Sequence, residues 1–189
     1  DDRATLESVV KTAVAWARAG IDILCCSTMV DGRIAAIRQA LDARNLTDMI
    51  LMSAIKYDSM FFKVGTAPPA AGALTDFDKA TFYLDPCNSR DALRIAATDL
   101  REGAEILSIM PAVPYLDVLK QLSDHFDVPT MAFSVSGDYS MAHFAGMHAG
   151  MDAYGCALET IQSLRRAGAS CVITHWADRM GAVHVPGQQ

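Results

Sequence analysis

The chain has 189 residues and a mass of 20.4 kDa, enough for one sizeable hydrophobic core and, by length, one domain over residues 1–189. Hydrophobic residues make up 51% of the chain, and no apolar run reaches the roughly 20 residues of a membrane helix, which excludes a disordered or membrane-spanning chain. The formal net charge of −6 argues against nucleic acid or an anionic membrane as the main partner.

Segments with apolar residues at helical spacing alternate along the chain with short, continuously apolar segments. In chain order, the pattern predicts a helix over 1–19, a strand over 21–26, a helix over 32–43, a strand over 49–55, an irregular stretch over 57–85, a helix over 89–102, a strand over 106–109, a helix over 115–125, a strand over 130–135, two helices over 140–167 broken near 146–150, and a strand over 171–174. The irregular stretch is long for a connection, which is typical of a functional lid.

This alternation predicts an α/β fold, and continuous hydrophobicity favours parallel strands covered on both faces. Three helix ends repeat the same joint, in which a basic last turn is followed by glycine and a strand: 18–21, 101–104 and 166–169. We therefore expect one partial (β/α) TIM barrel. Eight units normally need about 250 residues, so about three strands are missing from this length.

Lys56 is the candidate catalytic residue, because in such barrels the chemistry lies where strands end. It directly follows an apolar strand and is one of only five lysines. A desolvated amine has a lowered pKa and can form a Schiff base. The alternative is a lysine that reaches the rim and pairs with Asp58 or Asp31.

Two further strand ends carry polar residues. Ser134 and Ser136 are two positions apart on an expected strand and could bind a carboxylate or carbonyl; the alternative is a helix N-cap by Ser136 or Asp138. His175 follows the last strand and could act as an acid or base, although a lone histidine is more often structural.

The cysteines and histidines predict no metal site. The five cysteines (Cys25, Cys26, Cys87, Cys156 and Cys171) lack CxxC spacing and their number is odd, which favours reduced thiols in the cytoplasm. Cys25 and Cys26 should point to opposite faces of one strand, so a shared metal is not expected. No cofactor is indicated either, and no signal-like segment is present.

Six motifs in order resemble the porphobilinogen synthase (5-aminolevulinate dehydratase) family: 27–33 (STMVDGR), 52–57 (MSAIKY), 85–86 (DP), 110–117 (MPAVPYLD), 135–139 (VSGDY) and 165–169 (RRAGA). The resemblance implies a (β/α)8 barrel lyase, usually a homo-oligomer, that condenses two 5-aminolevulinate molecules through two strand-end lysines. Lys56 matches the first lysine. The second falls at Met110, which cannot form an imine.

The resemblance also implies substrate-binding residues, and several of these positions differ. Ser27, Asp31 and Ser136 match the family. Substituted positions are Phe62 for an aromatic hydroxyl, Tyr83 for a glutamine, and Phe133 and His175 for tyrosines. Only Lys63 and Lys79 are available in the lid region where arginines bind a substrate carboxylate. The family's metal ligands and first three strands would lie upstream of this chain.

We therefore expect little or no porphobilinogen synthase activity and leave open whether the chain is an enzyme. The leading hypothesis is a homologue kept for binding or assembly, with a keto acid, another tetrapyrrole-pathway metabolite or a protein as partner. The alternatives are an enzyme with Lys56 as a single Schiff-base amine on a keto or aldehyde substrate, aided by His175 or Asp31, and a residual synthase. An open barrel edge predicts an oligomer or a covering segment.

Overall fold

The computed structural model describes residues 2–62 and 82–180, without the side chain of Phe62. The elements are α1 (Asp2–Arg18), β1 (Ile23–Cys26), α2 (Arg33–Asp42), β2 (Ile50–Lys56), η1 (Met60–Phe62), α3 (Arg90–Arg101), β3 (Ile106–Met110), η3 (Val113–Tyr115), α4 (Leu116–His125), β4 (Thr130–Phe133), α5 (Ser136–Ala149), α6 (Ala153–Arg166), β5 (Cys171–Ile173) and α7 (Ala177–Met180). The predicted alternation of helices and strands is confirmed. The proposed lid is not tested, because residues 63–81 lie outside the described residues.

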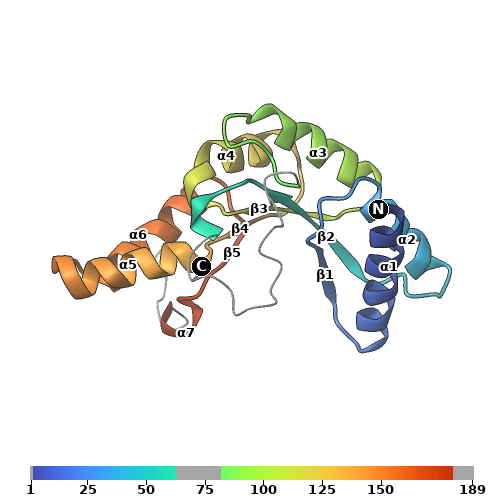
Figure 1. Ribbon diagram of the computed structural model, residues 1–189, viewed down its shortest axis with the longest axis horizontal. Helices are drawn as coiled ribbons and strands as arrows, with labels where there is room; N and C mark the ends of the chain where they lie inside the picture. Colours follow the sequence, from blue (N-terminus) through green and yellow to red (C-terminus); the bar gives the residue numbers. More distant parts are fainter. Residues whose placement is uncertain (1, 63–81, 181–189) are drawn as a thin grey trace.

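The five described strands form one parallel sheet in the order β1-β2-β3-β4-β5. The sheet curls like part of a barrel, and helices α1 to α4 lie on its convex side (Figure 1). The predicted α/β class and the partial TIM barrel are confirmed. Within the described chain, β1 and β5 each have one edge without a neighbouring strand.

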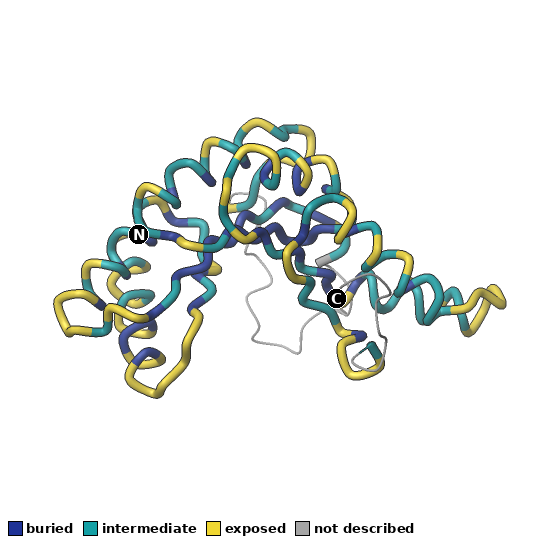
Figure 2. Tube along the Cα trace, turned by 180° about the vertical axis from the view of Figure 1, so that it is seen from behind, coloured by how far each residue is buried: buried dark blue, intermediate teal, exposed yellow. Residues whose placement is uncertain are grey.

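Alternation along each strand separates the two faces of the sheet. Leu24, Leu51 and Leu107 belong to clusters packed against the helices, so they mark the outer face. The residues between them face the inside of the curl. Buried residues gather along the strands and under the helices (Figure 2), which puts the main core on the convex side.

The fourth strand is shorter than the sequence suggests. It ends at Phe133, and α5 begins at Ser136 rather than near residue 140. The physical reason is a local cap: the Asp138 carboxylate accepts a hydrogen bond from the Val135 amide at 2.9 Å, which turns the chain into a helix. The helices α5 and α6 are separated at Gly150, whose φ is 66°. This position lies at the end of the range 146–150 in which the sequence predicts the break.

The helices α5 and α6 lie side by side and extend past the end of the sheet (Figure 1). None of the described helices is long and apolar enough to cross a membrane. The described residues also contain no group of three or more His, Cys, Asp or Glu side chains placed to hold a metal.

Candidate functional site

Lys56 is the last residue of β2 and lies on the inner face of the sheet. The chain returns beside it after residue 81: the Leu84 amide donates to the Lys56 carbonyl at 2.8 Å, and the Asp58 amide donates to the Leu84 carbonyl at 2.9 Å. This pairing brings the Tyr83 ring to 5.6 Å from Lys56 Nζ, within cation–π distance. Tyr83 stands where the family resemblance implies a glutamine, and its aromatic ring lies beside the Lys56 amine.

Met110 lies directly opposite Lys56 in the β2–β3 register. Its side chain is only 6% exposed, and the Tyr57 amide donates to its carbonyl at 3.0 Å, so both strand ends are held together. A thioether neither titrates nor forms an imine. The two neighbouring strand ends thus offer one amine and one apolar group.

A small polar cluster lies below Lys56 on the same face. Cys25 on β1, Ala54 on β2 and Ser108 on β3 lie on the inner face, and Ala54 pairs with Ser108 in the β2–β3 register. Burial raises the pKa of the Cys25 thiol above its ordinary value, while the charges of Lys56 and Arg33 and the bond with Ser108 lower it. Cys25 and Cys26 point to opposite sides of β1, as predicted from the alternation of side chains along a strand.

A buried ion pair supports this part of the sheet from behind. Arg33 on α2 donates two hydrogen bonds to Asp99 on α3, at 3.1 and 2.6 Å, and both side chains are 3% exposed. The Ser53 hydroxyl of β2 donates to the same carboxylate, and the Ser108 hydroxyl donates to the Ser53 carbonyl at 2.8 Å. The network fixes β2 and β3 relative to each other and to the helices.

The prediction of two serine hydroxyls on one side of a strand is wrong. Ser134 is buried directly after β4, whereas Ser136 is exposed at the start of α5. The N-cap alternative is closer to the structure, with Asp138 as the capping side chain. Burial raises the pKa of Asp138 to about 6, opposed by hydrogen bonds from Ser134 and Val135 and by the charge of His175.

Aromatic side chains gather around Tyr139, the residue that follows Asp138. The Tyr139 ring lies 6.0 Å from that of His175, 4.7 Å from that of Trp176 and 5.7 Å from that of His143, with which it stacks. His175 is exposed and Trp176 is buried at 3%. The end of β5 therefore provides an imidazole close to a carboxyl group whose pKa lies near neutrality.

The remaining predicted site residues are dispersed. Ser27 is exposed directly after β1, and Phe133 ends β4 opposite Ile173. Asp31 lines a cavity of about 250 Å³ between α2 and α3, together with Arg33. No described contact joins Asp31 to Lys56, and the side chain of Phe62 lies outside the described residues. The substrate-binding roles of these residues stay predictions.

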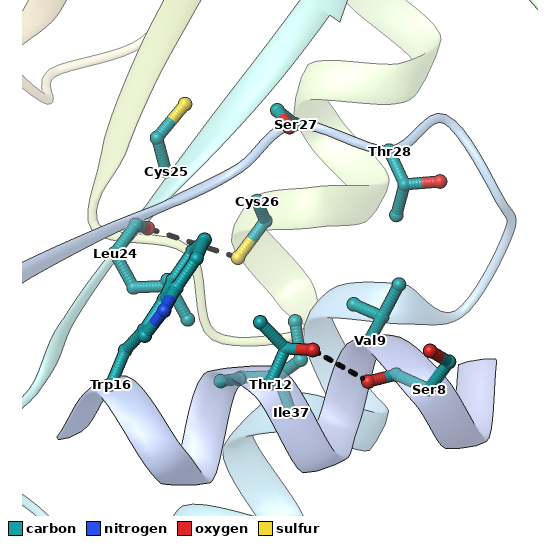
Figure 3. A pocket seen from close by; sticks show the side chains of 11 residues that line it. Ser8, Val9, Thr12, Trp16, Leu24, Cys25, Cys26, Ser27, Thr28 and Ile37 are labelled. Carbon is teal, nitrogen blue, oxygen red and sulfur yellow. Dashed lines mark hydrogen bonds between the residues drawn. The ribbon is translucent and has the colours of Figure 1, made fainter. Parts of the chain in front are cut away.

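A separate cavity of about 170 Å³ lies between α1 and β1, at the open edge of the sheet. Figure 3 shows Cys26 pointing into it beside Trp16, while Cys25 points to the other side of β1. Its lining is mainly apolar, and Trp16 is 53% exposed. The cavity lies at the edge where β1 has no neighbouring strand in the described chain, and Lys56 is not among its lining residues.

Comparison with protein families gives a match to "Delta-aminolevulinic acid dehydratase" over residues 1–183. The delta-aminolevulinic acid dehydratase of Rhodobacter capsulatus is 41% identical over 174 residues, covering 92% of this chain and 52% of the relative. That of Bacillus subtilis is 38% identical over 175 residues, with 92% and 53% covered. The chain spans about half the length of the curated relatives that it matches.

A comparison with solved structures finds the same family. The delta-aminolevulinic acid dehydratase of Toxoplasma gondii ME49, in complex with its reaction product porphobilinogen, superposes with a TM-score of 0.86 at 35% identity, covering 97% of this chain and 56% of that one. A 2,3-dimethylmalate lyase superposes with a TM-score of 0.50 at 13% identity, which shows a shared fold alone.

Proposed function

Since the chain belongs to the delta-aminolevulinic acid dehydratase family, we propose that it is a porphobilinogen synthase-like protein of tetrapyrrole biosynthesis that binds one 5-aminolevulinate-like keto acid through Lys56, without condensing two. One observation carries this proposal: the register places Lys56 opposite Met110. A condensation that holds each substrate as an imine needs an amine at both positions.

The chemistry at Lys56 is imine formation. The neutral amine attacks the ketone carbon, and loss of water leaves the ligand bound through a C=N bond. Tyr83 and buried Met110 lie beside the amine. A second ligand would have no covalent anchor, and the effective concentration that makes the two-imine reaction intramolecular would be lost.

Trapping with borohydride tests this proposal. The full chain is incubated with 5-aminolevulinate and borohydride, and the intact mass and peptide map are read. We expect a single reduced adduct on Lys56 and no porphobilinogen. Lys56→Ala is the negative control, and Met110→Lys, which restores an amine opposite Lys56, is expected to add a second adduct. Absence of an adduct at Lys56, or formation of porphobilinogen, contradicts the proposal.

A single-imine enzyme is the second candidate, and Asp138 favours it. A carboxyl group with a pKa of about 6 next to His175 suits proton transfer near neutral pH. Gly137 packs so closely on the Phe61 backbone that an added Cβ would lie 2.3 Å from the Phe61 carbonyl oxygen, which ties this turn to the segment after Lys56. Turnover of a keto or aldehyde compound that is lost in both Lys56→Ala and Asp138→Asn would support this candidate.

The open strand edges support an assembly. β1 and β5 lack outer neighbours in the described chain, and Ile23 of β1 is 44% exposed. We propose a cytoplasmic homo-oligomer that covers these edges. Light scattering coupled to size exclusion is expected to give a mass above 20.4 kDa at micromolar concentration, and a monomer contradicts it.

A further inference from the structure

We propose that one side of α5 is a contact surface for a second copy of this chain, in which the two α5 helices pack antiparallel about a twofold axis. The inference goes beyond the assembly proposed at the strand edges, and it does not depend on the chemistry of Lys56. It starts from an apolar projection that the rest of the described chain leaves uncovered.

The projection is the part of α5 and α6 that extends past the end of the sheet (Figure 1). No residue from 138 to 156 is buried in the described chain, although most of these residues are apolar or small. Its large apolar side chains, each between 49% and 62% exposed, form what we call the α5 stripe: Met141, Phe144, Met147 and Met151. Exposed apolar patches of this kind mark interaction sites.

The α5 stripe and the contact with α6 lie on different sides of the helix. Met141, Phe144 and Met147 are spaced by three residues, which keeps them within about a third of the helix circumference. The side that faces α6 is marked by Gly146, where an added Cβ would lie 2.9 Å from the Ala153 Cβ. The contact with α6 therefore leaves the stripe available to a partner.

Local contacts hold both halves of the stripe in place. The Phe144 ring stacks on the His148 ring, with the centroids 5.4 Å apart. After α5 ends, the Met151 amide donates to the Ala145 carbonyl at 3.4 Å, which keeps this residue beside the last turn. A surface that is already ordered loses less conformational entropy when it binds a partner.

The charges of this segment argue against a charged partner and against a membrane. Residues 139–151 contain no Asp, Glu, Lys or Arg, so a charged protein surface would find no complementary charge here. Helices that lie on membranes are rich in Lys and Arg on their polar face, and α5 has neither residue. The partner surface should therefore be apolar and uncharged.

The α5 stripe itself has these properties, and its residue order is nearly symmetric about position 146. When two copies of α5 lie antiparallel, Phe144 of one copy lies against Met147 of the other, and Met141 lies against Met151. Thioether sulfur makes favourable contacts with aromatic rings. A twofold contact requires one patch that complements itself, and the stripe meets this requirement.

The size of the stripe indicates a weak, reversible dimer. With about 200 Å² for each fully exposed side chain, the four residues expose on the order of 450 Å² per copy. Two copies would bury about 900 Å² from the stripe alone, which is at the low end for specific interfaces. We therefore expect a dimer whose population rises with concentration up to about 100 µM.

Opposite charges placed on the stripe test the contact. Phe144→Glu with Met147→Glu gives an acidic variant, and Phe144→Lys with Met147→Lys gives a basic one. In sedimentation equilibrium, each variant alone should self-associate at least about tenfold more weakly than the wild type, because like charges meet across the twofold axis. A 1:1 mixture should recover a dimer, and native mass spectrometry should identify it as the heterodimer.

Trp16→Glu is the matched control, because it places the same charge on an exposed aromatic residue beside β1. It should leave the α5 contact intact. A dimer that Trp16→Glu abolishes and the α5 variants retain overturns this inference in favour of the strand edges. A mixture that stays monomeric also overturns it. A monomeric wild type overturns both this contact and the strand-edge assembly, and leaves the Lys56 imine to its own test.

Oxidation of the wild-type protein provides a test without variants. Hydrogen peroxide in excess should convert Met147 to its sulfoxide more slowly at about 100 µM protein than at about 1 µM, because the dimer covers this side chain. Met60, which is 72% exposed and lies outside the stripe, should react equally at both concentrations. Equal oxidation of Met147 at both concentrations contradicts the contact, even where a variant fails to fold.

Discussion

Removal of the Asp99 carboxylate tests the buried network behind the Lys56 strand. In Asp99→Ala, Arg33 keeps its charge but loses both hydrogen bonds, and the Ser53 hydroxyl loses its acceptor. Both members of the ion pair are only 3% exposed, so bulk solvent does not solvate the unpaired Arg33 charge as it would on the surface. Breaking one side of such a buried pair costs about 3–5 kcal/mol.

Urea denaturation measures this cost. With an m-value of about 2 kcal/mol/M, a loss of about 4 kcal/mol lowers the midpoint by about 2 M. Asp99→Asn keeps a hydrogen-bond acceptor for Ser53 and should lose less. The double variant Arg33→Met with Asp99→Leu removes both buried charges and should recover much of the loss, because well-packed apolar groups can replace a buried ion pair.

Two outcomes would refute this reasoning. The first is an Asp99→Ala variant within about 1 kcal/mol of the wild type, which would mean that Arg33 finds solvent or another partner. The second is a double variant as unstable as Asp99→Ala alone, which would mean that the loss comes from packing and not from the unpaired charge.

Three further predictions concern the thiols, Asp138 and Gly137. Because burial raises the pKa of Cys25, iodoacetamide should alkylate Cys25 more slowly than exposed Cys171 at pH 8, and the gap should narrow at higher pH. Burial raises the pKa of Asp138 to about 6 from an ordinary 3.8, so the folded state binds more protons than the unfolded state between about pH 4 and 6. The contribution of Asp138 to stability should therefore rise as the pH falls through that window. Urea titrations at several pH values should show that Asp138→Asn loses this dependence. Gly137→Ala should lower stability by about 1–3 kcal/mol, because its Cβ would lie 2.3 Å from the Phe61 carbonyl oxygen.

The controls for these predictions come from the same chain. Gly155→Ala brings a Cβ to 2.7 Å from a side-chain oxygen of the exposed N-cap Asp152 and not from backbone, and it adds helix propensity, so it should cost less than Gly137→Ala. Equal effects of the two variants would contradict the steric argument. Equal alkylation of Cys25 and Cys171, or a pH dependence retained in Asp138→Asn, would contradict the other two predictions.

The sequence located the strands because each one is a short apolar run, and it placed Lys56 at a strand end, where the structure has it. It extended the fourth strand too far, since hydrophobicity continues through Val135 while the capping bond from Asp138 ends the strand at Phe133. A local backbone bond of this kind competes with apolar patterning and leaves little trace in it.

The buried network was missed for a different reason. Arg33 and Asp99 are 66 residues apart, and each looks like an ordinary charged residue on an amphipathic helix. Only the packing of α2 beside α3 brings them together. Likewise, the row formed by Cys25, Met52 and Ile106 on the inner face follows from a register across three strands. The single domain over residues 1–189 stays a prediction.

The strands follow one another in the sheet in the same order as in the sequence, which has a consequence for biosynthesis. Because β1 to β5 are neighbours in the order in which they are translated, each new strand can add to the one emerging just before it, with no wait for a distant segment. The sheet can thus form stepwise on the ribosome, beginning with β1 and β2. When translation pauses, the strands that have emerged form a partial sheet, and the free edge of its last strand can pair with the next strand. Limited proteolysis of ribosome-bound chains, arrested far enough beyond β3 for this strand to have emerged, should therefore find β1, β2 and β3 already protected.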